Sequence, residues 1–75
     1  MHTLYVMKSQ VLIKFGKRVR QLRDERCLSQ ERLGELAKVH RTYVGMIERG
    51  EKNITLTNIE KFAKALKIEI KDLFN

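Results

Sequence analysis

The residue types best suited to chemistry gather between Leu28 and Gly50, in the stretch LSQERLGELAKVHRTYVGMIERG. Arg41 carries forked donors that match guanine O6 and N7, and Thr42 offers a hydroxyl together with a methyl group that suits thymine. Helices predicted to begin at Gln30 and Arg41 present free N–H groups and partial positive charge, which favour phosphate. These residues therefore indicate contact with nucleic acid.

Catalytic and metal-binding sites find no support in the residue pattern. Cys27, His2 and His40 lack zinc-ligand spacing, and a single Cys cannot close an intramolecular disulfide. No Ser-His-Asp set, phosphate loop or carboxylate pair indicates an enzyme. We expect His40 either to cap a helix or to face the backbone, and Cys27 to fill a helix end; a redox-sensing Cys27 is the alternative, but it lacks a resolving Cys. The sequence thus predicts no catalysis, no cofactor and no metal.

The charge of the chain favours a polyanionic partner. The 75 residues include 16 Lys and Arg against 9 Asp and Glu, a net charge of +7, and most of the surplus lies in residues 1–30. A solvated helix face is the alternative explanation for such a basic run. No segment approaches the roughly 18 apolar residues of a membrane-spanning helix. Residues 1–7 are too short and polar for a signal peptide, so we expect a cytoplasmic protein without membrane contact.

Apolar periodicity predicts an all-α domain of five short helices behind an N-terminal arm. The arm covers residues 1–10 and the domain residues 11–75. Stripes at helical spacing, such as Val11, Phe15, Val19 and Leu22 or Leu56, Ile59, Phe62 and Leu66, mark the buried faces. Helix caps are expected at Ser29 and Thr55, with Gly50 ending the third helix. The five predicted helices cover residues 11–26, 30–37, 41–49, 56–66 and 70–74.

The second and third predicted helices are joined by Lys38 to His40, which matches a helix-turn-helix. Val39 is expected to plug the angle between them. With Val44 and Ile47 pointing inward, the remaining side chains of the third helix must face outward, and a small residue among them would let the backbone approach DNA. These outward residues are Arg41, Thr42, Gly45, Met46 and Arg49.

Three segments carry a resemblance to a known family: LSQERLGELA, VHRTYVGMIERG and NITLTNIEKFAKALKI. From Phe15 to Phe74 the chain resembles the Cro/C1-type helix-turn-helix family, also called the XRE or lambda-repressor-like family. Within it, HRTYVGMIERGEKNITLTNIEKFAKAL is most similar to the small controller proteins of restriction–modification systems. Those proteins are homodimers that regulate their own gene together with the endonuclease gene.

The resemblance implies roles for individual positions. It assigns base reading to Arg41, Thr42 and Met46, although Met46 replaces a commonly polar residue and offers apolar contact alone. It assigns contact with the DNA backbone to Gln30, Tyr43, Lys52 and Asn53. It implies a structural salt bridge between Arg23 and Glu48. Cys27 and Lys38 stand where the family often has Gly, so we expect left-handed backbone at both.

The C-terminal segment carries more apolar surface than its own core requires. We expect Leu73 to close the helix bundle, and Ile70 and Phe74 to contact a second copy of the chain. A two-fold dimer would place its third helices in successive major grooves about 34 Å apart, on a palindromic operator.

The pattern as a whole predicts a homodimeric, sequence-specific regulator of transcription that binds double-stranded DNA. The resemblance adds RNA polymerase as a partner. One alternative is an antitoxin or phage-type repressor that acts with a protein partner. Another is a basic RNA-binding or protein-interaction module without sequence preference.

Overall fold

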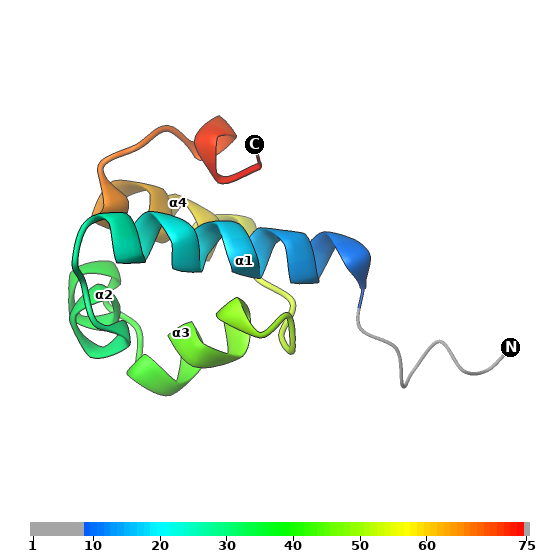
Figure 1. Ribbon diagram of the computed structural model, residues 1–75, viewed down its shortest axis with the longest axis horizontal. Helices are drawn as coiled ribbons and strands as arrows, with labels where there is room; N and C mark the ends of the chain where they lie inside the picture. The colour runs from blue at the N-terminus through cyan, green and yellow to red at the C-terminus, as the bar shows by residue number, and fades with distance from the viewer. Residues whose placement is uncertain (1–8, 75) are drawn as a thin grey trace, which may run out of the picture.

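The computed structural model describes residues 9–74, which form helices joined by short turns and loops and contain no strand. In Figure 1, α1 runs along the length of the molecule, with α3 on one side and the C-terminal helix η2 on the other. The predicted all-α class is confirmed. The elements are α1 (Gln10–Glu25), α2 (Gln30–Ala37), α3 (Arg41–Glu48), α4 (Leu56–Leu66) and the 3₁₀ helix η2 (Ile70–Phe74).

The count of five α-helices is not confirmed, because the last element is a 3₁₀ helix. The N–H of Asp72 donates to the carbonyl of Glu69 at 3.0 Å, a bond across three residues that tightens this short turn. At the other end, α1 begins at Gln10. The predicted N-terminal arm lies outside the described residues up to residue 8.

Side-chain caps fix where three helices begin. Ser29 Oγ accepts from the Arg32 N–H at 2.9 Å, and Thr55 Oγ1 accepts from the Asn58 N–H at 3.1 Å. His40 Nδ1 accepts from the Thr42 N–H at 3.0 Å at the start of α3. Each bond satisfies a helical N–H that has no intrahelical partner. The expected caps at Ser29, Thr55 and His40 are confirmed.

Left-handed backbone ends several helices. Cys27 has φ 55° and Lys38 has φ 60°, as the sequence predicted, and Gly50 has φ 71° after α3. Lys67, which the sequence analysis did not single out, also has φ 60°. Such a conformation costs a non-glycine residue about 1 kcal/mol.

The core contains side chains from every element. Predicted stripe residues such as Phe15, Val19, Ile59 and Phe62 are buried, and Leu73 is fully buried as expected. The prediction is wrong for the first residue of two stripes, which was expected to be buried: Val11 is 62% exposed and Leu56 is 74% exposed. Both lie in the first turn of their helices, which extends past the core.

Candidate nucleic-acid interface

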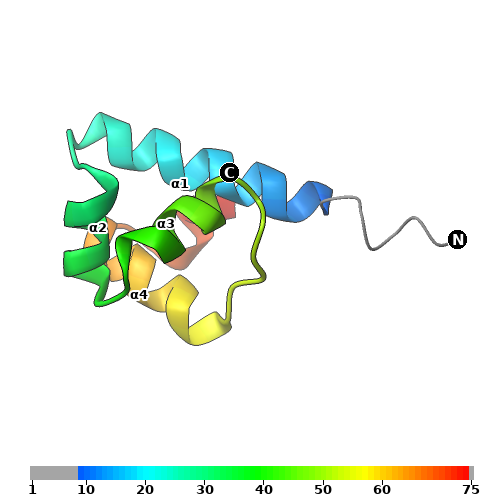
Figure 2. The same ribbon diagram turned by 90° about the horizontal axis from the view of Figure 1, so that it is seen from below.

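The turn between α2 and α3 holds these helices in close contact. A Cβ atom at Gly34 would lie 2.7 Å from the carbonyl oxygen of Val39, so a side chain there would collide with the turn. The Val39 N–H donates to the carbonyl of Gly34 at 2.9 Å, while its half-buried side chain packs on the core as the predicted plug. The helix α3 therefore lies at the edge of the molecule, facing the viewer in Figure 2.

The residues predicted to face outward from α3 do so, except Gly45. Arg41 and Thr42 are exposed and Met46 is half-buried. Gly45 is buried, which corrects the expectation of a bare backbone on this face. A Cβ at Gly45 would lie 3.0 Å from Arg49 Nη1 and 3.5 Å from Gln30 Oε1, because these two side chains lie over it.

Arg49 is a candidate interface residue to which the sequence analysis gave no role. Its Nε lies 3.1 Å from Glu51 Oε2, and its guanidinium extends back across Gly45. The lack of a side chain at Gly45 makes room for this arrangement. Arg49 thereby places a cation on the face that also presents Arg41. Its outward position followed from the helical spacing, but its path across the helix did not.

A part-buried ionic network joins α1, α2 and α3. Arg23 Nε lies 2.6 Å from Glu48 Oε2 and Arg23 Nη2 lies 3.0 Å from Glu48 Oε1, a two-pronged ion pair. The Glu48 side chain is 3% exposed and that of Arg23 is 11% exposed. Arg23 Nη1 also donates to the carbonyl of Leu28 at 2.8 Å. The hydrogen bond to Glu48 is the main cause that raises the pKa of Arg23, so the guanidinium stays charged.

The same carboxylate orients Gln30, the expected phosphate-binding residue. Gln30 Nε2 donates to Glu48 Oε1 at 3.0 Å, which leaves the second N–H of the amide to point elsewhere. Since Glu48 is held by Arg23, the Gln30 amide is fixed relative to α3 before any ligand arrives. This arrangement suits an amide donor that must meet a phosphate oxygen.

Tyr43 is held between α3 and α4. Its hydroxyl oxygen accepts from Asn58 Nδ2 at 3.0 Å, and its ring lies edge-on to Phe62 with centroids 6.3 Å apart. Because the oxygen accepts this bond, the hydroxyl hydrogen can still be donated. The contact of Asn58 with Tyr43 was not predicted, since no local spacing in the sequence connects the two residues. Lys52 and Asn53 are exposed in the loop that follows α3.

Apolar side chains are exposed where α1 begins and η2 ends. Phe74 is 52% exposed and Ile70 is 38% exposed, and the Phe74 ring lies 5.3 Å from that of Phe15. Val11 and Phe74 line one small hollow of about 140 Å³ together with Leu73. The sequence predicted Ile70 and Phe74 for contact with a second copy, and the structure adds Val11 to this surface.

Neither a metal-binding cluster nor a membrane-spanning helix occurs among the described residues. Among residues 9–74, no three His, Cys, Asp or Glu side chains come together in a way that could hold a metal ion. None of the helices in this range has the length and apolarity needed to cross a membrane.

Comparisons with known proteins agree on one family. A helix-turn-helix family model matches residues 19–73. The Control protein C.BamHI of Bacillus amyloliquefaciens is 44% identical over 70 residues, which cover 92% of this chain and 86% of the relative. The Control protein C.SmaI of Serratia marcescens is 44% identical over 58 residues, covering 77% and 69%. The crystal structure of the restriction-modification controller protein C.AhdI from Aeromonas hydrophila is 52% identical with a TM-score of 0.83, covering 84% and 96%.

Proposed function

Because this chain belongs to the helix-turn-helix family of DNA-binding transcription regulators, we propose that it is a homodimeric controller protein of a restriction–modification system. The observation that carries the proposal is the similarity to controller proteins over nearly the whole chain, at 44% to 52% identity. The family regulates transcription and is not enzymatic. The proposal places the protein in the cytoplasm, where it would reach its operator.

In the proposed mechanism, α3 enters the major groove of double-stranded DNA. Arg41 and Thr42 read base edges from its first turn, and Met46 makes an apolar contact one turn later. The exposure of Arg41 and Thr42 supports these roles. The cap from His40 supports them further, because it ties the N–H of Thr42 and so steadies the start of the helix.

Contacts with the DNA backbone set the register of the reading helix. We assign these contacts to Gln30, Tyr43, Lys52 and Asn53. The anchored amide of Gln30 and the anchored phenol of Tyr43 support the assignment, since each is held by one hydrogen bond and keeps another donor hydrogen for a ligand. The ion pair of Arg23 and Glu48 would contribute to DNA binding indirectly, because Glu48 holds the side chain of Gln30.

Dimerisation would repeat this arrangement about 34 Å away on a palindromic operator. The helix η2 takes the place of the predicted fifth helix, and we assign the dimer contact to Ile70 and Phe74 on it. Following the family resemblance, binding at one operator site would recruit RNA polymerase, and binding at a second site would block it.

Selection of bound duplexes from a random DNA pool tests the proposal. The purified protein would be used at about 0.15 M salt, where weak contacts to phosphate alone are largely screened. We expect a palindromic consensus with half-sites one helical turn apart. Binding that shows no enriched sequence and fades steadily with salt would contradict the proposal and favour a non-specific basic module.

Two single variants separate base reading from backbone contact. Arg41→Ala removes a forked donor, so preference should relax at one base pair in each half-site by about 1–3 kcal/mol. Gln30→Ala removes a phosphate contact and should weaken all sequences about equally. Both effects are read by repeating the selection with each variant. If Gln30→Ala changed the consensus and Arg41→Ala did not, the assigned roles would be wrong.

A further inference from the structure

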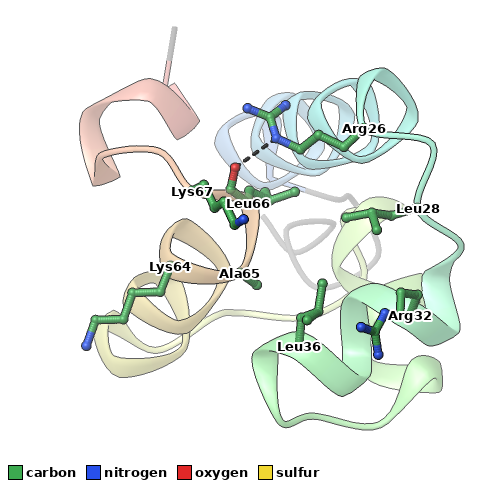
Figure 3. Close-up of a pocket in the computed structure, with 8 residues that line it drawn as sticks. All are labelled: Arg26, Leu28, Arg32, Leu36, Lys64, Ala65, Leu66 and Lys67. Atoms are coloured by element: carbon green, nitrogen blue, oxygen red, sulfur yellow. Dashed lines mark hydrogen bonds between the residues drawn. The ribbon is translucent and has the colours of Figure 1, made fainter.

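A basin of about 480 Å³ lies between α2 and the C-terminal ends of α1 and α4 (Figure 3). None of its lining residues comes from α3 or from the loop that follows it. From the chemistry of this basin we infer that it docks an acidic segment of a protein partner, which inserts one apolar side chain between surrounding cations. The inference rests on the proposed function, because it gives a surface for protein contact to a regulator whose α3 is engaged in the major groove of DNA.

The floor of the basin is apolar. Leu28 and Ala65 are half-buried there, and Leu66 is fully buried beneath them. Leu36 is 42% exposed although it lies on α2 beside residues of the core. A leucine left open in this position gives an incoming apolar side chain a surface against which it can lose its hydration.

The rim of the basin is cationic. Arg26, Arg32, Lys64 and Lys67 line it, and none of the lining residues is acidic. Arg26 is held in place, since its Nε donates to the carbonyl of Leu66 at 2.8 Å and its Nη1 to the carbonyl of Leu22 at 2.9 Å.

The other three cations of the rim are available to a ligand. Arg32 pairs with Glu35 at 2.9 Å, but both side chains are 58% exposed, so the pair is weak and exchangeable. Lys64 and Lys67 form no ion pair within residues 9–74. One cation at the end of α4 is accounted for by the helix dipole. The helix dipole does not explain why four cations surround one apolar floor, and this number fits a ligand with several negative charges.

The combination distinguishes between classes of anion. A DNA backbone has the charges but presents no apolar side chain to the floor. A small monoanion could cover the apolar floor, but its single charge would leave most of the cations of the rim without a counter-charge. A peptide segment with several carboxylates around one leucine or phenylalanine satisfies the floor and the rim together, because it combines one apolar side chain with several negative charges.

The test is a titration of the full-length, ¹⁵N-labelled protein with the blocked peptide Asp-Asp-Leu-Asp-Asp, followed by amide chemical shifts. We expect saturable shifts at millimolar peptide, confined to the amides around Leu36, Ala65 and Leu66. Asn-Asn-Leu-Asn-Asn removes the charges and Asp-Asp-Ser-Asp-Asp removes the apolar anchor. Each control peptide should bind about tenfold more weakly.

Two double variants with equal loss of charge complete the test. Lys64→Gln with Lys67→Gln removes two rim cations, whereas Lys17→Gln with Arg20→Gln removes two exposed cations of α1 outside the basin. The first pair should weaken peptide binding about tenfold and the second less than about twofold.

Three results would overturn the inference. They are the absence of any shift, equal weakening by the two double variants, and shifts spread over the α3 face, which would mean general attraction to a basic surface. The titration contains no DNA, so its failure and the failure of the operator selection are separate results.

Discussion

Around α2 and α3, the polar side chains of Glu48, Gln30 and Tyr43 are held by partners within the chain, whereas apolar side chains where α1 begins and η2 ends stay exposed. In the first region Glu48 binds both Arg23 and Gln30. In the second region Val11 and Phe74 are more than half exposed. The proposed reading region, formed by α2, α3 and the residues that hold them, thus has its supporting contacts within one chain. The terminal region, formed by the start of α1 and the end of η2, leaves apolar surface exposed that a second copy would cover under the proposed function. Substitutions that act on one region alone test this contrast.

The largest effect is expected from Glu48→Ala. It removes the buried carboxylate that Arg23 contacts at 2.6 Å and leaves the mostly buried guanidinium with the exposed carboxylate of Asp24, 3.3 Å away, as its remaining ion-pair partner among the described residues. The substitution should therefore cost about 3 kcal/mol of the free energy of unfolding. Urea denaturation followed by circular dichroism measures the loss. Should the variant fail to fold, Glu48→Gln keeps the shape and an acceptor, and is expected to lose less.

Glu35→Ala is the matched control for this carboxylate. Glu35 pairs with Arg32 at 2.9 Å, but both side chains are 58% exposed to solvent. Its loss should change the free energy of unfolding by less than about 1 kcal/mol. Equal losses for the two Glu variants would show that the network around Arg23 does not stabilise the reading region.

The next effect is expected at the crossing of α1 and α3. A Cβ atom at Gly16 would collide with the carbonyl oxygens of Ile47 and Glu48, the latter at 2.6 Å. Because backbone cannot move aside without separating the helices, Gly16→Ala should cost about 2 kcal/mol. The midpoint of urea denaturation measures it.

Gly45→Ala is the contrasting substitution at a glycine of the same reading region. Its added Cβ meets the flexible Arg49 side chain, and alanine favours a helix by about 1 kcal/mol over glycine. We expect unchanged or raised stability together with weaker operator binding, since Arg49 must shift. A loss of stability as large as that of Gly16→Ala would mean that Arg49 is as rigid as backbone.

A smaller effect is expected in the terminal region, and it should appear in assembly. Phe74→Asp puts a charge on the proposed dimer surface and should weaken the dimer roughly tenfold, about 1.4 kcal/mol, as measured by sedimentation. Leu56→Asp is the control, because Leu56 is a 74% exposed apolar residue on α4. Equal dissociation by both variants, or by neither, would contradict the assignment of Phe74.

The sequence predicted the features that depend on neighbouring residues. Helical periodicity located the helices, and the caps at Ser29 and Thr55 followed from single residue types before apolar runs. The cap at His40 was one of two roles expected once a metal-ligand role was set aside. Left-handed backbone at Cys27 and Lys38 was predicted through the family resemblance.

Features that depend on packing between distant segments could not be predicted from local sequence patterns. The side chain of Arg49 covers Gly45, and Asn58 holds Tyr43 across 15 positions of the chain. Periodicity also assigned Val11 to the core, since a stripe shows which face is apolar but not how far the core extends along the helix. The base-reading and dimer residues stay predictions, because each role involves a partner molecule.

The smallest effect compares two helix ends with the same backbone. Lys38 after α2 and Lys67 after α4 both have φ 60°, with ψ 44° and 45°. The N–H of Val39 donates to the carbonyl of Gly34 at 2.9 Å, and that of Ile68 to the carbonyl of Ala63 at 3.0 Å. Glycine relieves left-handed strain at such a position, so each Lys→Gly substitution should add about 1 kcal/mol to the free energy of unfolding.

Equal gains at Lys38 and Lys67, measured by urea denaturation, would mean that the backbone is held equally firmly beside the reading region and before η2. The contrast between the two regions would then lie in their exposed side chains alone. A much smaller gain at Lys67 would mean that its backbone relaxes the strain by moving. Where the lysine can already relieve the strain in this way, its replacement by glycine adds no stability. In that case the segment that leads from α4 into η2 would be looser than the turn after α2, and a second copy of the chain that contacts η2 would have to order this segment on binding.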